Sequence, residues 1–454
     1  MRKCLLAALM AAAMFAAVSP AASVAGGSKK THFCPPGTQL SAYCACPPGH
    51  NSAYCECLHG TEVSAYWGGN KGSANWGGNN GAAYCECLSG ASMTGPGHPA
   101  TLFVDGSTVF GSTAYKTIGA AVAAASAGSQ IIVCPGVYPE DVTVSKPLTI
   151  VGINAVIDAT NLNNGFMIGT AGAGSRIQGF TIENAVGEGI LAMNTSNVSI
   201  VDNVIDGNDK GMPPAKSTYA QCSGPNADCG EGVHLWSTTN SQVVGNTIRG
   251  NSGGVLLTDE TGPTDGNLIS HNTVEDNVDD CGITLAGHNP LAAPGGVPNP
   301  AVGGIFNNVI SHNVAVGNGT APPPAQGAGI LIATPLSGGA VYNNTISANF
   351  IRGNGLSGVT VHGHTSGEDL NGNQIIDNVI ATNNVSGDPD FSPVVDPSTT
   401  GVFVGTASPL TITIEHNVIY ANTNGIFLTG PGLINTTQID HNLFFGVTNT
   451  VVGP

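Results

Sequence analysis

The chain has 454 residues, of which 64 are glycine and only 9% are charged, and its formal net charge is −17. Such an acidic surface excludes nucleic acids and anionic lipids as expected partners, because both need a basic surface. Intrinsic disorder is also excluded over most of the chain, because a disordered segment would carry more charge and fewer Val and Ile residues. We therefore expect a folded protein with many tight turns and few long charged side chains.

Residues 1–25 have the pattern of a signal peptide. Arg2 and Lys3 precede an apolar run over residues 4–18, and the small residues 23–25 form a cleavage site. The run is short for a membrane span, and no later segment reaches its length. The pattern predicts a chain without a transmembrane segment that is secreted to the extracellular side or held at the cell surface.

Residues 26–100 are predicted to form a Cys- and Gly-rich, mostly irregular extension. A short unit, Ala-Tyr-Cys-Ala/Glu-Cys, occurs at residues 42–46, 53–57 and 83–87. A segment of this composition cannot bury a core of its own. Two interpretations stay open: a metal-binding or surface-attachment module that uses the Cys-x-Cys pairs, and an extension held together by disulfides. The spacing differs from the Cys-x-x-Cys of strong zinc sites.

The next segment is predicted to cap a solenoid. Residues 101–105 form a short strand, and residues 115–125 are Ala-rich with Ile118 and Val122 four apart, which predicts a small amphipathic helix that ends at Gly128. A stack of coils needs such a cap, because its terminal coil otherwise exposes core residues and strand edges.

A repeat of short strands then runs from Ile131 to the end of the chain. The phrase Asn-x-x-x-x-Asn recurs along this segment. The shortest intervals between successive copies are 25 and 26 residues, and insertions such as 211–230, 289–302 and 384–400 lengthen the other intervals. A period of 25 residues with three short strands predicts a β-helix coil. Asn tolerates the left-handed turn conformation, and its amide can bond to the Asn of the next coil. The phrases begin at Asn203, Asn246, Asn272, Asn313, Asn349, Asn378 and Asn417, and Asn442 begins an eighth.

Each phrase leads into a strand that begins with Gly-Ile or Gly-Val. Strand side chains alternate with period two, so positions one and three after the Gly face the core and positions two, four and six face outward. The strands begin at Gly232, Gly254, Gly282, Gly329, Gly358, Gly401 and Gly425.

These features resemble the pectin-lyase-like superfamily over residues 101–450. The cap sequence from Tyr115 and the segment Ala127–Tyr138 look like the usual entry to that fold. The resemblance implies an all-β, right-handed parallel β-helix with a short N-terminal capping helix over residues 101–454. Members range from pectate lyases, polygalacturonases and uronan epimerases to adhesins without catalysis, so the resemblance does not fix the function.

The polygalacturonase motifs are matched only in part. Asp279-Asp280-Cys281 and Gly287-His288 look similar to them, but they lie eight residues apart in one coil, and no Arg-Ile-Lys motif follows. We therefore carry over no catalytic assignment from that family. The Lys and Arg pairs expected of many lyases are missing too.

The outward positions of stacked strands form columns along one face, and the titratable residues of the middle coils lie in these columns. Glu260 and His288 fall on adjacent coils within hydrogen-bond reach, which predicts an acid–base pair. For a glycosidase the two carboxylates would be Glu260 and Asp280, with His288 orienting one of them. The predicted catalytic residues are Glu260, Asp280, His288 and Asp259, and the predicted substrate-binding residues are His234, Trp236, His362 and His364.

Three interpretations of this face stay open. The first is a carbohydrate-active enzyme, a hydrolase or a lyase/epimerase, whose partner is a polysaccharide. A neutral glycan suits the acidic surface more easily than a polyuronate, which would need a bridging divalent cation such as calcium. The second is a non-catalytic surface or adhesive rod with a solvated face, and a homotrimer of rods is left open. The third is a metal site formed by Glu260, His288, His362 and His364.

The remaining histidines and cysteines have structural interpretations. Four histidines each precede a ladder Asn and are expected to be repeat positions, namely His271, His312, His416 and His441. Cys222 and Cys229 bracket an insertion that a disulfide could close. Cys134 and Cys281 fall in or beside strands and are predicted to be core thiols.

Overall fold

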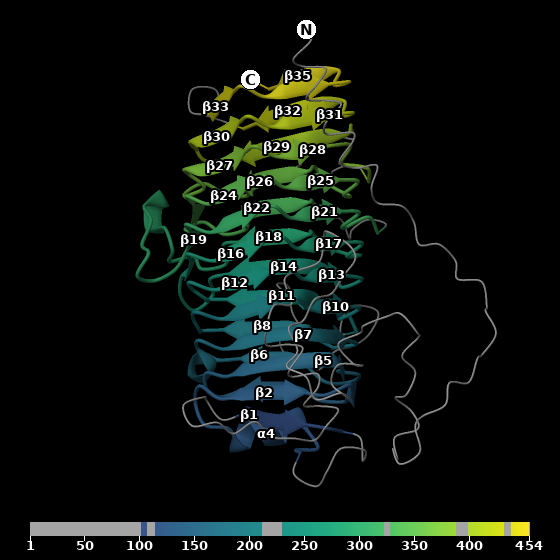
Figure 1. The fold of residues 1–454 in the computed structure, drawn as a ribbon. Coiled ribbons are helices and arrows are strands. Elements are labelled where there is room, and N and C mark those ends of the chain that lie inside the picture. The colour runs from purple at the N-terminus through teal and green to yellow at the C-terminus, as the bar shows by residue number, and fades with distance from the viewer. Residues whose placement is uncertain are drawn as a thin grey trace, which may run out of the picture. The chain divides into compact units, whose positions relative to one another are not determined.

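The computed structural model of this protein describes residues 101–106, 114–210, 229–321, 327–386, 398–430 and 437–453. All of these belong to the unit Val63–Pro454, one of two into which the chain divides. In this unit short strands stack coil upon coil, from β1 and the helix α4 at one end to β35 at the other (Figure 1). The predictions for residues 1–25 and 26–100 fall outside the described residues and stay predictions.

One sheet has eleven strands and holds one strand from each coil. Its strands, in chain order, are β4 Val142–Val144, β6 Phe166–Ile168, β8 Ile190–Met193, β11 Glu231–Trp236, β14 Gly253–Thr258, β18 Ile283–Ala286, β22 Ile330–Thr334, β26 Val359–Gly363, β29 Thr400–Thr406, β32 Asn424–Thr429 and β35 Asn449–Val452.

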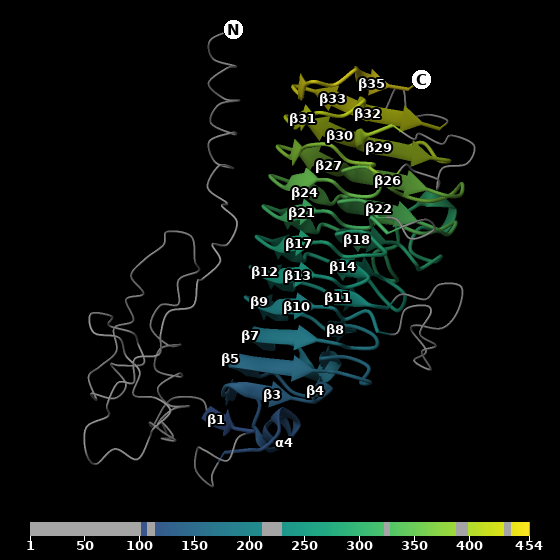
Figure 2. The same cartoon turned by 90° about the vertical axis from the view of Figure 1, so that its right-hand side faces the viewer.

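A second sheet has 21 strands, and its pairings form two columns that share the long strands β5 and β7. The first column contains β1 Thr101–Val104, β2 Gln130–Val133, β5 Thr149–Asp158, β7 Arg176–Glu183, β9 Ser199–Val201, β12 Gln242–Val244, β16 Leu268–Ser270, β20 Val309–Ser311, β24 Thr345–Ser347, β27 Asn373–Ile376, β30 Ile412–Glu415 and β33 Thr437–Asp440. The second column adds β3 Gly136–Tyr138, β10 Val204–Asp206, β13 Thr247–Arg249, β17 Thr273–Glu275, β21 Val314–Val316, β25 Phe350–Arg352, β28 Val379–Ile380, β31 Val418–Tyr420 and β34 Leu443–Phe445. Figure 2 shows β10, β13 and β17 of this column beside β11, β14 and β18 of the eleven-stranded sheet.

A third, small sheet consists of β15 Thr264–Asp265, β19 Ile305–Phe306 and β23 Val341–Tyr342. Neighbouring coils pair in parallel in all three sheets, for example β11 with β14 and β14 with β18. Parallel neighbours joined by crossovers take the right-handed connection. The predicted fold class, an all-β right-handed parallel β-helix, is confirmed.

The interior of the coils is a stack of aliphatic side chains. Positions one and three after the strand glycines are buried, as predicted, and each strand therefore contributes two residues to one continuous core. The pairs are Val233 and Leu235, Val255 and Leu257, Ile283 and Leu285, Ile330 and Ile332, Val359 and Val361, Val402 and Val404, and Ile426 and Leu428.

The predicted asparagine ladders are present at two turns. In one of them, Asn272 Nδ2 donates to Asn313 Oδ1 at 3.0 Å, and Asn313 Nδ2 donates to Asn349 Oδ1 at the same distance. Asn313 is 1% exposed, so these amides replace water as partners for turn backbone groups. Sequence reasoning missed a third ladder, which lies five residues before the first and contains Asn267, Asn308, Asn344 and Asn373.

The helix predicted over residues 115–125 is α4, Ile118–Ala124. Thr117 caps its first turn by accepting from the Ala120 N–H, and the Glu140 carboxylate accepts from the N–H groups of Ile118 and Gly119. Its buried side chains, Ile118, Ala121 and Val122, pack toward β1, β2 and β4. Its role as a cap stays a prediction.

The cysteine predictions have different outcomes. Cys281 is a free, buried thiol, as predicted, and burial raises its pKa well above the ordinary value. Cys134 is disulfide-bonded, so its prediction as a core thiol is wrong. The position of a cysteine in or beside a strand does not show whether it has a disulfide partner. Cys229 is disulfide-bonded too, but Cys222 lies outside the described residues, and their pairing stays a prediction.

Candidate functional site

The strands of the eleven-stranded sheet stand in the register that their glycines predict. His234 pairs with Leu256 and Leu256 with Thr284, and the columns continue from coil to coil. Position four holds Trp236, Thr258, Ala286, Ala333, His362, Gly405 and Thr429 in successive coils. Glu260 and His288 follow the ends of β14 and β18, at what we call the C-terminal edge of this sheet.

Much of the outward face is buried, which departs from the expected solvated surface. His234 and Thr258 are 0% exposed and His362 is 5% exposed. Coils stack about 4.8 Å apart, so each side chain stands between those of its neighbours, and alternation alone does not show how much surface remains. The exposed part of the candidate site lies farther on, at the C-terminal edge.

Glu260 and His288 are in contact, as predicted. The Nδ1 atom of His288 lies 2.9 Å from Glu260 Oε1, and the two side chains are 17% and 25% exposed, respectively. Burial raises the pKa of Glu260. The hydrogen bond from His288, the charge of His234, the Thr258 hydroxyl and the charge of His288 together lower it by more, so the net pKa lies below its ordinary value. Glu260 is therefore an ionised acceptor that keeps the proton on Nδ1 of His288.

Asp259 fixes the backbone that carries His288. Its Oδ1 accepts from the N–H groups of His288 and Asn289 at 2.7 and 3.1 Å, and its Oδ2 accepts from Gly304 at 2.6 Å. The carboxyl is 0% exposed. Burial raises its pKa to about 6, against the lowering by these three N–H groups. Asp259 thus holds both ends of residues 287–304, a loop that leaves the coil after β18 and that we call an excursion.

A buried chain of polar groups lies behind the pair. His234 Nε2 lies 2.9 Å from the Thr258 hydroxyl, and His234 Nδ1 lies 3.4 Å from Glu188 Oε1. Glu188 is 0% exposed and accepts the N–H of Glu231 on its other oxygen at 2.8 Å. Sequence reasoning missed Glu188. The signal was present, because Glu188 precedes Gly189 as Glu231 precedes Gly232.

Trp236 lies at the start of the C-terminal edge. Its ring stacks on His234 with centroids 5.7 Å apart, and its Nε1 donates to the Thr261 hydroxyl at 3.2 Å. The Thr261 hydroxyl also contacts Asn194 Oδ1 at 2.7 Å and the Ser237 hydroxyl at 3.0 Å. These hydrogen bonds connect the indole to residues of three coils. Thr261 follows Glu260 in the chain, and Asn194 and Ser237 line a pocket.

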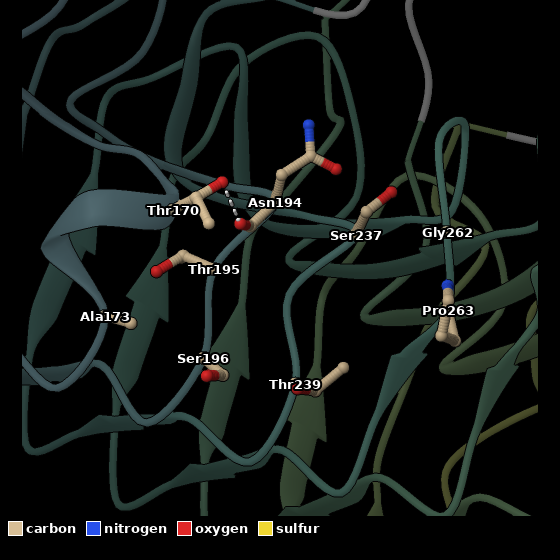
Figure 3. A pocket seen from close by; sticks show the side chains of 9 residues that line it. All are labelled: Thr170, Ala173, Asn194, Thr195, Ser196, Ser237, Thr239, Gly262 and Pro263. Carbon is tan, nitrogen blue, oxygen red and sulfur yellow. Dashed lines mark hydrogen bonds between the residues drawn. The ribbon is translucent and has the colours of Figure 1, made fainter.

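The pocket lies beside this network and has a volume of about 320 Å³ (Figure 3). Four successive turns of the β-helix line it, and they present hydroxyl and amide groups with no charged side chain. Thr170 donates to the backbone oxygen of Asn194 across two of these turns at 2.7 Å. The lining residues are Thr170, Ala173, Asn194, Thr195, Ser196, Ser237, Thr239, Gly262 and Pro263.

His362 and His364 form a second cluster. Their rings meet edge to face with centroids 4.5 Å apart, and His364 is exposed. Burial, and secondarily the charge of His364, lowers the pKa of His362 to about 3. The buried Glu368 accepts from the backbone N–H of His364 at 3.0 Å. His364 lies two coils beyond His288, which corresponds to about 10 Å at the spacing of stacked strands.

Asp280 lies at the other edge of the sheet. It precedes β18, and its N–H donates to the Ser252 carbonyl just before β14, whereas Glu260 follows β14. The six residues of β14 span about 20 Å. The structure therefore does not bring Asp280 to the Glu260–His288 pair. Instead, Asp280 Oδ1 accepts the N–H of Cys281 at 2.6 Å.

The four residues of the predicted metal site are not gathered around one point. Within the described ranges, no group of three or more His, Cys, Asp or Glu side chains is placed to hold a metal ion. The pairs Glu260–His288 and His362–His364 lie on different coils, with the coil of β22 between them. In the same part of the chain, no helix has the length and apolar character to cross a membrane.

One family model matches part of the chain. It is described as the periplasmic copper-binding protein NosD and matches residues 122–314. The matched segment includes the coils of Glu188, His234, Glu260 and His288, and it covers less than half of the chain. A comparison with curated proteins gives no match.

Solved structures with this kind of coil are similar to the chain. An alginate lyase from Paenibacillus sp. str. FPU-7 is 13% identical, with a TM-score of 0.44, over 74% of this chain and 95% of the lyase. A pectate lyase is 15% identical, with a TM-score of 0.42, over 76% and 80%. The surface adhesin PfbA of Streptococcus pneumoniae is 11% identical, with a TM-score of 0.45, over 74% and 86%. At these identities none of the three indicates the activity of this chain.

Proposed function

We propose that this protein binds a polysaccharide along the C-terminal edge and acts on it by proton transfer at the Glu260–His288 pair. The 2.9 Å contact between these partly exposed side chains carries the proposal. The adjacent pocket supports it, because hydroxyl and amide groups suit sugar hydroxyls and Trp236 offers an aromatic face near by.

In this proposal His288 exchanges the proton and Glu260 orients it. A carboxylate that accepts from one imidazole nitrogen fixes the tautomer and raises the basicity of the ring. The Asp259 contacts hold the His288 backbone in place, and the chain from Glu188 through His234 favours the ionised form of Glu260. The pair is thus held by groups that need not rearrange when a substrate binds.

The arrangement favours elimination or epimerisation over hydrolysis. Glycosidases need two carboxyl groups about 5–9.5 Å apart on either side of the bond. Asp280 lies at the opposite edge, and Asp259 is buried under three N–H donors. A single acid–base pair can abstract the proton from the carbon next to the carboxyl group of a uronate. In elimination the bond from the neighbouring carbon to the glycosidic oxygen then breaks and that oxygen leaves with a proton, whereas in epimerisation a proton returns to the opposite face of the same carbon.

The expected place of action is outside the cytoplasm. The signal-peptide pattern of residues 1–25 supports this, and the name of the matched family model describes a periplasmic protein. A non-catalytic rod that only binds glycans is the alternative outcome of the test below.

The test is incubation of the full chain with a panel of neutral and acidic polysaccharides. Elimination gives unsaturated products that absorb ultraviolet light, hydrolysis gives new reducing ends without that absorbance, and epimerisation changes the sugar NMR signals alone. We expect product formation that Glu260→Gln and His288→Gln each abolish while the fold is retained. The matched control is Glu275→Gln on β17, in the other large sheet, which should keep full activity.

Two results would overturn the proposal. Product formation that persists in both variants would place the chemistry elsewhere. Binding without any product, unchanged by either variant, would support the non-catalytic rod.

A further inference from the structure

Four exposed histidines lie outside the site described above, at one turn of the coils. Each adopts the left-handed conformation, with φ between 53° and 58°, and each precedes a ladder asparagine, of which the first three are buried and Asn442 is partly buried. Histidine is enriched in this conformation, so one such residue by itself requires only a structural explanation. The four residues are His271, His312, His416 and His441.

The histidines come in two pairs on adjacent coils. The rings of His271 and His312 are parallel, with centroids 4.9 Å apart. Those of His416 and His441 are within 3° of parallel, with centroids 5.1 Å apart. The ladder below fixes this spacing, because Asn272 donates to Asn313 and Asn417 donates to Asn442. Each pair thus presents two imidazoles side by side to solvent on a rigid support.

One ring of each pair is also oriented by a neighbour. His271 Nδ1 lies 2.7 Å from the Ser270 hydroxyl, and His441 Nδ1 lies 3.1 Å from Asp440 Oδ2. The carboxylate of Asp440 accepts only, so it fixes the tautomer of His441 and directs Nε2 outward, as partners of metal-bound histidines do; the Ser270 hydroxyl orients the ring of His271. Asp377 occupies the same turn position one coil before His416, so the second pair lies in the more acidic environment.

We propose that each histidine pair binds one transition-metal ion of the zinc, nickel or copper class through its two Nε2 atoms. Imidazole suits these ions. Two ligands on a tetrahedral ion with bonds of about 2.1 Å lie about 3.4 Å apart. The stacked rings, with centroids 4.9 and 5.1 Å apart, must tilt toward each other to reach that separation. No third side chain joins either pair within the described residues, so water completes the coordination. The proposal is independent of the acid–base pair.

The test is calorimetric titration of the full chain with Zn²⁺ at neutral pH, with imidazole nitrogen NMR to identify the ligands. The double variants His271→Asn/His312→Asn and His416→Asn/His441→Asn should each lose one equivalent of bound Zn²⁺, and the quadruple variant should lose two. Asn keeps the turn conformation, because Asn343 adopts it with φ of 54°. The control is Ala348→Asn, at the same turn between the two pairs, which should bind as the original chain does.

Zinc bound by cysteines elsewhere should be the same in every variant. The difference in bound Zn²⁺ between the original chain and a variant therefore counts only the zinc held by the histidine pairs. Equal stoichiometry in the original chain and the quadruple variant would overturn the proposal, provided that thermal unfolding shows both to be folded. Zinc-induced shifts confined to other imidazoles would overturn it as well.

Discussion

The asparagine turns and the C-terminal edge are built on the same coils and differ in regularity. At the ladders, successive coils place the same side chain in the same position, and the contact Asn272–Asn313–Asn349 repeats with constant distances. At the C-terminal edge the coils carry excursions of different lengths, such as 259–263 and 287–304. The regular turns serve the architecture, since any coil needs them. The irregular edge holds the Glu260–His288 contact that we propose as the acid–base pair, so under this proposal the departure from the repeat is the better guide to function.

The two regions also satisfy polar groups differently. A ladder amide such as Asn313 meets the asparagines and the backbone groups of the equivalent turns in the neighbouring coils, so each partner is a repeat position of an adjacent coil. Asp259 meets three N–H groups from two ends of an excursion, and Glu188 reaches His234 across a long insertion. These contacts depend on segments far apart in the sequence. Substitutions in the two regions should therefore have different effects.

The largest effect is expected from Asn313→Ala in the middle of a ladder. The change removes the acceptor of the Asn272 N–H and Nδ2 groups and the side-chain donor to Asn349 Oδ1 and the Ile269 carbonyl. The Asn272 groups and the Ile269 carbonyl lose this partner in a buried site, whereas Asn349 Oδ1 keeps the backbone N–H of residue 313. Since each unpaired group costs 1–3 kcal/mol, the free energy of unfolding should fall by about 4 kcal/mol in denaturant titrations. Asn442→Ala, at the partly exposed end of the ladder, should cost less than half as much. Equal costs would show that the ladder does not act as a continuous buried array.

Gly254→Ala should have the next largest effect. A Cβ atom there would clash with the Gly282 carbonyl and with Cγ1 of Val274, both of which are held in the stack. Overpacking of this kind should lower the free energy of unfolding by about 3 kcal/mol. Gly169→Ala is the control, because no atom lies within 4 Å of its added methyl group. A tolerated Gly254→Ala would contradict the glycine register.

Asp259→Ala should weaken the C-terminal edge and leave the ladders intact. The N–H groups of His288, Asn289 and Gly304 lose their acceptor, at a cost of about 2 kcal/mol. Hydrogen exchange should accelerate at these three amides and remain unchanged at the buried Asn313 amide. Uniform acceleration throughout the chain would show that Asp259 stabilises the whole fold rather than one excursion.

The remaining prediction concerns pH, and its effect on the free energy of unfolding is the smallest near neutral pH because it accumulates only as the pH falls. The pKa of His362 is lowered to about 3 by burial, while an unfolded histidine titrates near 6.5. The stabilising contribution of neutral His362 is present above pH 6.5 and is lost as the pH falls toward 3, with a slope of about 1.4 kcal/mol per pH unit. His362→Gln should reduce the dependence of unfolding free energy on pH by this slope over that window. Identical slopes in the two proteins would contradict the assignment.

The sequence predicted most of the architecture and the one contact between candidate site residues, Glu260 and His288, that the structure shows. The glycine starts and the asparagine phrases fixed the register that places Glu260 next to His288, because both features recur in each coil. Glu188 was missed, since an insertion separates its coil from that of His234. Asp280 was grouped with Glu260 although it precedes its strand, and only the paired strands show that these residues lie at opposite edges.

What the sequence determined by itself is the coil: its period, its turns and its two inward positions per strand. Side-chain alternation and the turn preference of asparagine act within a few residues, so they can be seen without coordinates. Only the tertiary structure decided that the outward histidines are buried, that Asp259 fixes an excursion and that Glu188 lies next to His234. These contacts join coils separated by insertions of different lengths, and no local rule determines which distant side chains meet.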